Sequence, residues 1–68
     1  MITVDAIGRS CPEPVLLTKQ GLKESPDGIS VLVDNAIAVE NITRFAGNQG
    51  YQVAKKEENG VYTLEITR

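Results

Sequence analysis

One residue in the sequence is a strong intrinsic nucleophile: Cys11, the single cysteine among 68 residues. It stands in the string Ser10-Cys11-Pro12-Glu13-Pro14, directly before an apolar stretch typical of a helix. Proline is tolerated in the first helical turn, because the N–H groups there have no intrahelical partner. Those free N–H groups and the helix macrodipole favour an anion, and thiolates at such positions have depressed pKa values. The pattern therefore predicts a reactive thiol at a helix start, where a thiolate or persulfide anion would be stabilised.

Two residues compete for the position that caps this helix. Ser10 with Glu13 three residues later matches a capping box. Pro12 biases the preceding Cys11 toward extended backbone, so Cys11 is equally a candidate for the cap. In either arrangement we expect the sulfur to project at the helix tip. Glu13 opposes thiolate formation there by like charge, and Arg9 favours it.

The composition excludes most of the catalytic groups that assist a thiol in an enzyme. There is no histidine, so a Cys–His dyad and a histidine metal site are impossible, and a second cysteine to resolve a disulfide is absent. A chain of 68 residues buries only about 60% of its unfolded surface, which excludes a large enclosed cavity. We therefore expect no cofactor, no metal and no small-molecule substrate. A nucleophile without assisting catalytic groups is more typical of a carrier than of an autonomous enzyme.

Charge and hydropathy narrow the class of protein further. Seven basic and nine acidic residues give a net charge of −2, so there is no basic footprint for nucleic acid. The apolar runs are too short to cross a bilayer, and the first residues lack the regions of a signal peptide. We expect a cytoplasmic protein with no membrane span, folded as a single domain over residues 1–68.

The helix that follows the cysteine is predicted from about residue 11 or 12 to about residue 23. Its buried stripe is expected to comprise Val15, Leu16 and Leu22. Gly21 weakens a helix by up to about 1 kcal/mol relative to alanine. We expect that Gly21 permits a close approach to a neighbouring element, and that this packing offsets the cost.

A second strand–helix pair follows a turn-forming segment. Residues 29–33 are nearly all apolar and β-branched, which is typical of a central strand. Asp34 or Asn35 is expected to cap the next helix, and Gly50 to end it. The apolar residues of that helix recur at three- and four-residue spacing, which predicts an amphipathic stripe: Ala38, Val39, Ile42, Phe45 and Ala46.

Three further strands complete the predicted fold. Residues 2–5 alternate between apolar and polar, as do 51–57 and 61–67, and Asn59-Gly60 between the last two is a strong hairpin signal. The order is βαβαββ. If the sheet grows in one direction, right-handed crossovers place both helices on one face. The sequence therefore predicts an α/β (α+β) two-layer sandwich, with two helices on one face of a mixed four-stranded sheet.

The Cys-Pro-x-Pro string, preceded by Asp-x-x-Gly, resembles the signature of the SirA/TusA/YedF sulfur-carrier family, and the resemblance covers the whole chain. The matching positions are Asp5, Gly8, Cys11, Pro12, Pro14, Val15, Gly28 and Gly50. The resemblance implies a small βαβαββ protein whose cysteine relays sulfur as a persulfide through protein–protein contacts. By that analogy Cys11 bears the sulfur, and Gly8, Pro12, Glu13 and Pro14 support it structurally. It also implies two partners, a sulfur donor such as a cysteine desulfurase and an acceptor sulfurtransferase.

The second helix departs from the TusA-like pattern. Those members usually show Asp-Pro at its start and Asp-Ile within it, whereas this chain has Asp34-Asn35 and Asn41-Ile42. The difference resembles the YedF-type branch, which is linked to selenium metabolism and often carries a second domain. It weakens an assignment to tRNA thiolation, and it allows the chain to be the N-terminal domain of a longer protein.

Two other hypotheses stay open. One is a non-catalytic regulatory or interaction module, in which Cys11 is only a helix-cap residue. The other is a nucleic-acid binder, because related two-layer folds include RNA-associated domains. Its lysines form two separate pairs beside glutamates, Lys19 with Lys23 and Lys55 with Lys56, and such runs are usually solvated surface. The nucleic-acid hypothesis therefore ranks last.

Overall fold

The fold was obtained as a computed structural model, which describes residues 2–9 and 13–68. Six elements follow one another in the predicted order βαβαββ: β1 (Ile2–Asp5), α1 (Glu13–Glu24), β2 (Gly28–Val33), α2 (Ala36–Asn48), β3 (Gln52–Glu58) and β4 (Val61–Thr67). Strand bounds differ from the predicted ones by at most one residue. The predicted start of the first helix, at residue 11 or 12, lies outside the described residues.

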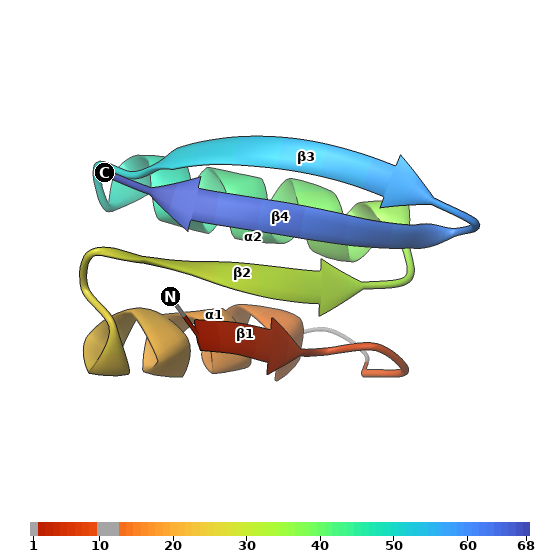
Figure 1. The fold of residues 1–68 in the computed structure, drawn as a ribbon, viewed down its shortest axis with the longest axis horizontal. Helices are drawn as coiled ribbons and strands as arrows, with labels where there is room; N and C mark the ends of the chain where they lie inside the picture. Colours follow the sequence, from red (N-terminus) through yellow and green to blue (C-terminus); the bar gives the residue numbers. More distant parts are fainter. Residues whose placement is uncertain (1, 10–12) are drawn as a thin grey trace.

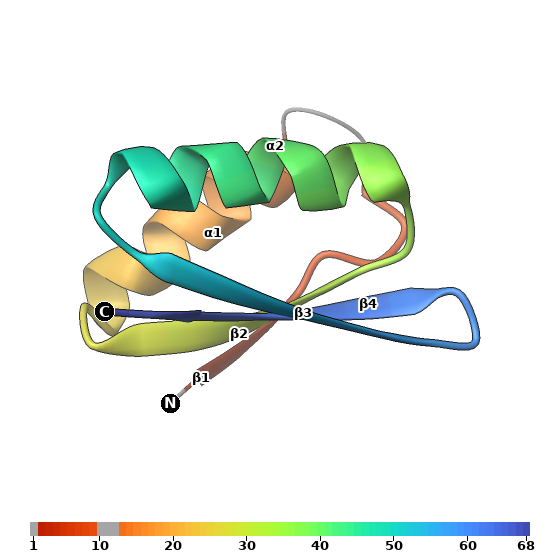
Figure 2. The same cartoon turned by 90° about the horizontal axis from the view of Figure 1, so that it is seen from above.

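The four strands form one mixed sheet in the order β1-β2-β4-β3. β1 is parallel to β2, and β4 is antiparallel to both of its neighbours. The hairpin therefore folds back so that β4 lies between β2 and β3 (Figure 1). Both helices cover the same face of the sheet, and the opposite face is left open (Figure 2). The predicted two-layer sandwich is confirmed.

The core lies between the sheet and the helix pair. The central strands contribute alternate residues that pair across the ladder, Ile29 with Ile66 and Val31 with Leu64. From the other layer, α2 contributes one side of its apolar stripe. The fully buried side chains, with no exposed area, include Ile29, Val31, Val33, Ile42, Ala46, Leu64 and Ile66. This aliphatic core holds both helices in fixed positions on the sheet.

The first helix packs onto the sheet through a glycine, as predicted. A Cβ atom at Gly21 would lie 2.9 Å from Val4 Cγ2 and 3.0 Å from Ile29 Cδ1. Real Cβ atoms do not approach other heavy atoms so closely without a shift, so a larger residue would push α1 away from β1 and β2. Gly21 therefore lowers the helix propensity of α1 but allows the helix to pack closely on the sheet.

The predicted buried stripe of this helix was wrong at one residue, Leu16. It is 55% exposed, whereas Leu22 is buried and Val15 is half-buried. The residues that face the sheet follow the three- and four-residue spacing of a helix: Pro14, Thr18, Gly21 and Leu22. Leu16 falls between these positions, so its side chain points away from the core.

Local signals fixed the ends of the second helix. Asn35 is its cap, and its Oδ1 atom accepts a hydrogen bond from the N–H of Ala38 at 2.8 Å. At the other end Gly50 has a φ of +87°, and the N–H of Tyr51 donates to the carbonyl of Ala46 at 2.9 Å. This arrangement is a Schellman motif, which favours glycine at that position. Both predicted ends are confirmed, and Asn35 rather than Asp34 is the cap.

Candidate functional site

The structure places three of the five predicted site residues, Gly8, Glu13 and Pro14, on either side of residues 10–12. Cys11 and Pro12 lie outside the described residues. Gly8 belongs to the loop after β1, and Glu13 and Pro14 are the first two residues of α1. Glu13 is exposed and Pro14 is buried. The described part of the site is therefore the loop 6–9 together with the first turn of α1.

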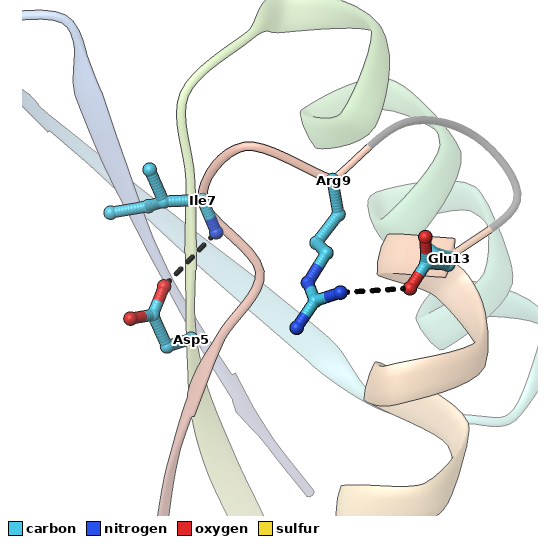
Figure 3. A network of polar contacts seen from close by, with 4 residues as sticks. All are labelled: Asp5, Ile7, Arg9 and Glu13. Atoms are coloured by element: carbon cyan, nitrogen blue, oxygen red, sulfur yellow. Dashed lines mark hydrogen bonds and ion pairs between the residues drawn. The ribbon is translucent and has the colours of Figure 1, made fainter.

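Hydrogen bonds from three neighbouring places hold the loop 6–9. The N–H of Ile7 donates to Asp5 Oδ1 at 3.0 Å (Figure 3), and the N–H of Ala6 donates to the carbonyl of Leu32 at 2.9 Å. Across a longer sequence separation, the N–H of Gly8 donates to Asp34 Oδ2 at 3.1 Å. The chain before residues 10–12 is therefore tied to the junction between β2 and α2.

An ion pair links the chain on the two sides of residues 10–12. Arg9 Nη1 lies 3.3 Å from Glu13 Oε2 (Figure 3). The two side chains are 54% and 51% exposed, so solvent screens the pair and its contribution to stability is small. Its electrostatic consequence is local. The two charges that were expected to act on the thiol in opposite directions offset each other.

The starts of the two helices lie at the same end of the helical layer (Figure 1). The N–H groups in the first turn of a helix lack the intrahelical acceptors that later residues have, and in α1 Glu13 and Val15 stand at such positions. Within the helix, Thr18 Oγ1 donates to the carbonyl of Pro14 at 2.8 Å. Backbone donors with a positive helix end can stabilise an anion placed before the helix.

A groove lies between the two helix starts, with a volume of about 270 Å³. We call it the helix-start groove. Its lining is mostly apolar and comes from the loop and from both helices: Arg9, Pro14, Val15, Asn35, Ile37, Ala38 and Asn41. Ile37 is 68% exposed although it is large and apolar. The volume falls just below the range of about 300–1,000 Å³ typical of small-molecule sites.

Three residues of this region were not among the predicted site residues: Asp34, Ile37 and Asn41. The sequence indicates Asp34 only as a candidate helix cap, yet its Oδ2 accepts a hydrogen bond from the N–H of Gly8, 26 positions away. Ile37 and Asn41 were given no role, and both line the groove. The available signals were an isoleucine outside the apolar stripe and an asparagine at its edge. Neither signal identifies a groove unless the relative position of the two helices is known.

The described residues offer little to other kinds of site. Over residues 2–9 and 13–68, no three residues of the histidine, cysteine, aspartate or glutamate types gather closely enough to hold a metal ion. In the same part of the chain, neither helix is long and apolar enough to cross a membrane.

Comparison with known proteins identifies a family and several relatives, among them the following. The family model described as "Sulfurtransferase TusA" matches residues 2–68. A protein of Methanocaldococcus jannaschii, named as a candidate sulfur carrier protein, is 47% identical over 60 residues, which cover 85% of this chain and 80% of that protein. The crystal structure of a SirA-like protein from Desulfitobacterium hafniense is 41% identical, with a TM-score of 0.89 over 98% of this chain and 96% of that one.

Proposed function

The chain belongs to the TusA sulfurtransferase family, and from this premise we propose that it is a small sulfur carrier that holds sulfur as a persulfide on Cys11. The observation that carries the proposal is the family match over residues 2–68 of a chain with a single cysteine. That cysteine stands two residues before the first described residue of α1. The likeness to a relative named as a sulfur carrier supports the same role.

The proposed chemistry is two successive displacements at sulfur. The Cys11 thiolate attacks the outer sulfur of a persulfide on the donor protein, the donor's S–S bond breaks, and the donor thiolate leaves. Cys11 then holds the outer sulfur in a new S–S bond. An acceptor thiolate attacks that sulfur, and the Cys11 thiolate leaves in turn. Electrons balance in each step without an external oxidant or reductant.

The residues around Cys11 in the sequence support this chemistry. A positive helix end stabilises the thiolate both as attacking group and as leaving group. The ion pair between Arg9 and Glu13 keeps their combined charge near zero, which leaves the helix end as the main local field. Because the sequence holds no second cysteine and no histidine, the donor and the acceptor must supply the remaining catalytic groups. We propose a cysteine desulfurase as donor and a sulfurtransferase as acceptor.

The test is to incubate the chain with a cysteine desulfurase and cysteine, and then to measure its intact mass. We expect one added sulfur, about 32 Da, that dithiothreitol removes. The matched control is Cys11→Ser, which should gain nothing. An unmodified wild-type chain, or an equal gain on Cys11→Ser, would contradict the proposal. A parallel incubation with a selenium donor tests whether the carrier also accepts selenium.

A second candidate function is an interaction module that uses no thiol chemistry. The exposed apolar side chains of Leu16 and of Ile37, which lines the helix-start groove, favour it. A titration of the thiol separates the two functions. A pKa near the ordinary value of about 8.5 favours the module, and a clearly lower pKa favours the carrier. For a pure module, Cys11→Ala should bind its partner as the wild type does.

A further inference from the structure

Asp34 is the first residue after β2, at the edge of the sheet where β1 also ends. Because β1 and β2 are parallel, the segments that follow them leave the sheet at the same edge. Asp34 Oδ2 accepts a hydrogen bond from the N–H of Gly8 at 3.1 Å. Its other oxygen, Oδ1, accepts from Asn35 Nδ2 at 3.4 Å. One carboxylate therefore contacts both the loop 6–9 and the residue that caps α2.

The usual reasons for an acidic residue before a helix do not explain this contact. The cap of α2 is Asn35, whose Oδ1 accepts from the N–H of Ala38 at 2.8 Å. The positive end of a helix favours a nearby carboxylate without any particular hydrogen bond. The bond to Gly8 instead joins residues 26 positions apart, and a charged acceptor makes the stronger kind of hydrogen bond to a backbone N–H. Asp34 therefore makes a specific contact that helix capping does not need.

Gly8 is held by little else in the described part of the chain. Its φ is +78°, in the left-handed region that favours glycine, and a Cβ atom there would meet nothing within 4 Å. The other backbone bonds of the loop involve Ala6, whose N–H donates to the carbonyl of Leu32 at 2.9 Å and whose carbonyl accepts from the N–H of Arg9 at 3.3 Å. The bond to Asp34 is therefore what fixes Gly8 relative to the second helix.

We propose that Asp34 is a positioning residue for sulfur transfer, which holds Gly8 so that the chain leaves the loop 6–9 from a fixed point. The inference rests on the proposed carrier function, and it gives a role in transfer to a residue that does not itself bear sulfur. Gly8 stands three positions before Cys11 in the sequence. Because each residue extends the chain by at most about 3.6 Å, a fixed point three residues away limits where the chain can place a thiol.

Positioning matters for a protein donor and much less for a small reagent. A persulfide on a folded protein can be attacked only from the direction that the two surfaces leave open, so a misplaced thiolate slows the displacement. A small reagent such as iodoacetamide has no such restriction. Loss of positioning should therefore slow transfer from a protein donor alone. Loss of the Asp34 charge has the opposite sign, because a carboxylate disfavours a nearby thiolate and its removal would speed both reactions.

The test measures two rates for each variant, loading from a cysteine desulfurase with cysteine and alkylation by iodoacetamide, at a temperature where all variants are folded. Asp34→Ala should load about three- to tenfold more slowly than the wild type, with alkylation no slower. Asp34→Asn keeps a side-chain oxygen without the charge and should load within about twofold of the wild type. The matched control is Gly50→Ala at the far end of α2, where φ is +87°. It strains the backbone away from the loop 6–9 and should load like the wild type.

A further variant tests whether the effect passes through Gly8. Gly8→Ala disfavours the left-handed backbone and should also slow loading, and adding it to Asp34→Ala should cost little more, because both changes act on one link. The positioning role is overturned, and the carrier stands, if Asp34→Ala loads at least as fast as the wild type, if its alkylation slows equally, or if Asp34→Asn loads as slowly as Asp34→Ala. If the wild type takes sulfur from neither the desulfurase nor inorganic polysulfide, both proposals fall.

Discussion

The helix-start groove has a counterpart at the other ends of the same two helices, and the two have opposite chemistry. We call this second concave surface the helix-end pocket, and it is lined by Lys19, Leu22, Lys23, Phe45, Gln49, Tyr51 and Arg68. The groove is mostly apolar, and its one cationic residue, Arg9, is paired with Glu13. The pocket carries three cations and no acid. The comparison teaches that one pair of helices can present different surfaces at its two ends. At one end the lining is mostly apolar, and at the other three cationic side chains gather without an acidic one.

The helix dipole explains why the charges divide in this way. Acidic groups near the helix starts, Asp34 and Glu13 among them, are stabilised by the positive helix ends, and Lys23 is stabilised by the negative end of α1. The polar contacts also differ between the two ends. Carboxylates hold the loop beside the groove, whereas a backbone carbonyl, that of Pro26, holds Tyr51 and Arg68 beside the pocket.

The largest stability effect should come from a core residue in the middle of α2, the helix that joins the two regions. Ile42 lies in the middle of α2 and is fully buried, so Ile42→Ala should lower the free energy of unfolding by about 3 kcal/mol. The matched control is Ile37→Ala on the same helix, which is exposed and should change it by less than about 0.5 kcal/mol. Urea denaturation measures both. Equal effects of the two variants would contradict the described packing of α2.

The two ends of α2 should respond similarly to the loss of their caps. Asn35→Ala removes the side chain that accepts from the N–H of Ala38 and should cost about 1 kcal/mol. Gly50→Ala forces a Cβ into a left-handed backbone of φ +87° and should cost about 1–2 kcal/mol. Asn35→Asp keeps an acceptor and should restore most of the stability. If Gly50→Ala were neutral in urea denaturation, the described helix end would be wrong.

Local sequence signals were sufficient to predict some parts of the structure, the hairpin and the close packing of α1 among them. Asn59-Gly60 specified the hairpin because both residues adopt positive φ, 53° and 82°. Gly21 indicated a close contact because a glycine inside a helix has a cost that packing must offset. Neither inference needed knowledge of a distant residue.

The features that could not be predicted depend on residues far apart in the chain. The alternation of apolar and polar residues along a strand does not determine which strands pair. It therefore does not predict that β4 lies between β2 and β3. The bond from Gly8 to Asp34 joins two loops, and each residue alone has an ordinary local explanation. The exposure of Leu16 depends on which side of α1 meets the sheet, which short apolar runs leave undetermined.

The link from the loop 6–9 to the second helix should give a smaller and more local effect. Asp34→Ala removes the acceptor for the N–H of Gly8 and should cost about 1 kcal/mol or less at this exposed position. Amide hydrogen exchange at Gly8 should accelerate, while exchange in the helix-end pocket should not change. Asp34→Asn keeps a side-chain oxygen and should exchange like the wild type. Faster exchange at both ends would mean that the two regions are not independent.

The smallest effect should come from the ion pair beside the groove. Arg9→Gln removes the partner of Glu13, and because both side chains are about half exposed the change in unfolding free energy should be about 0.5 kcal/mol or less. The rate of sulfur loading is the more informative readout. With Glu13 no longer offset, loading should slow at low salt and recover as salt screens the charge. A faster rate would contradict the proposed electrostatic role of the pair.

The most direct test of the central claim follows sulfur through the chain. The loaded chain is purified away from the donor, mixed with an acceptor sulfurtransferase, and both masses are then measured. The account predicts that the added mass of about 32 Da leaves Cys11 and appears on the acceptor, and that Cys11→Ser delivers none. If the mass stays on the chain, or if Cys11→Ser delivers sulfur equally well, Cys11 is not the carrier.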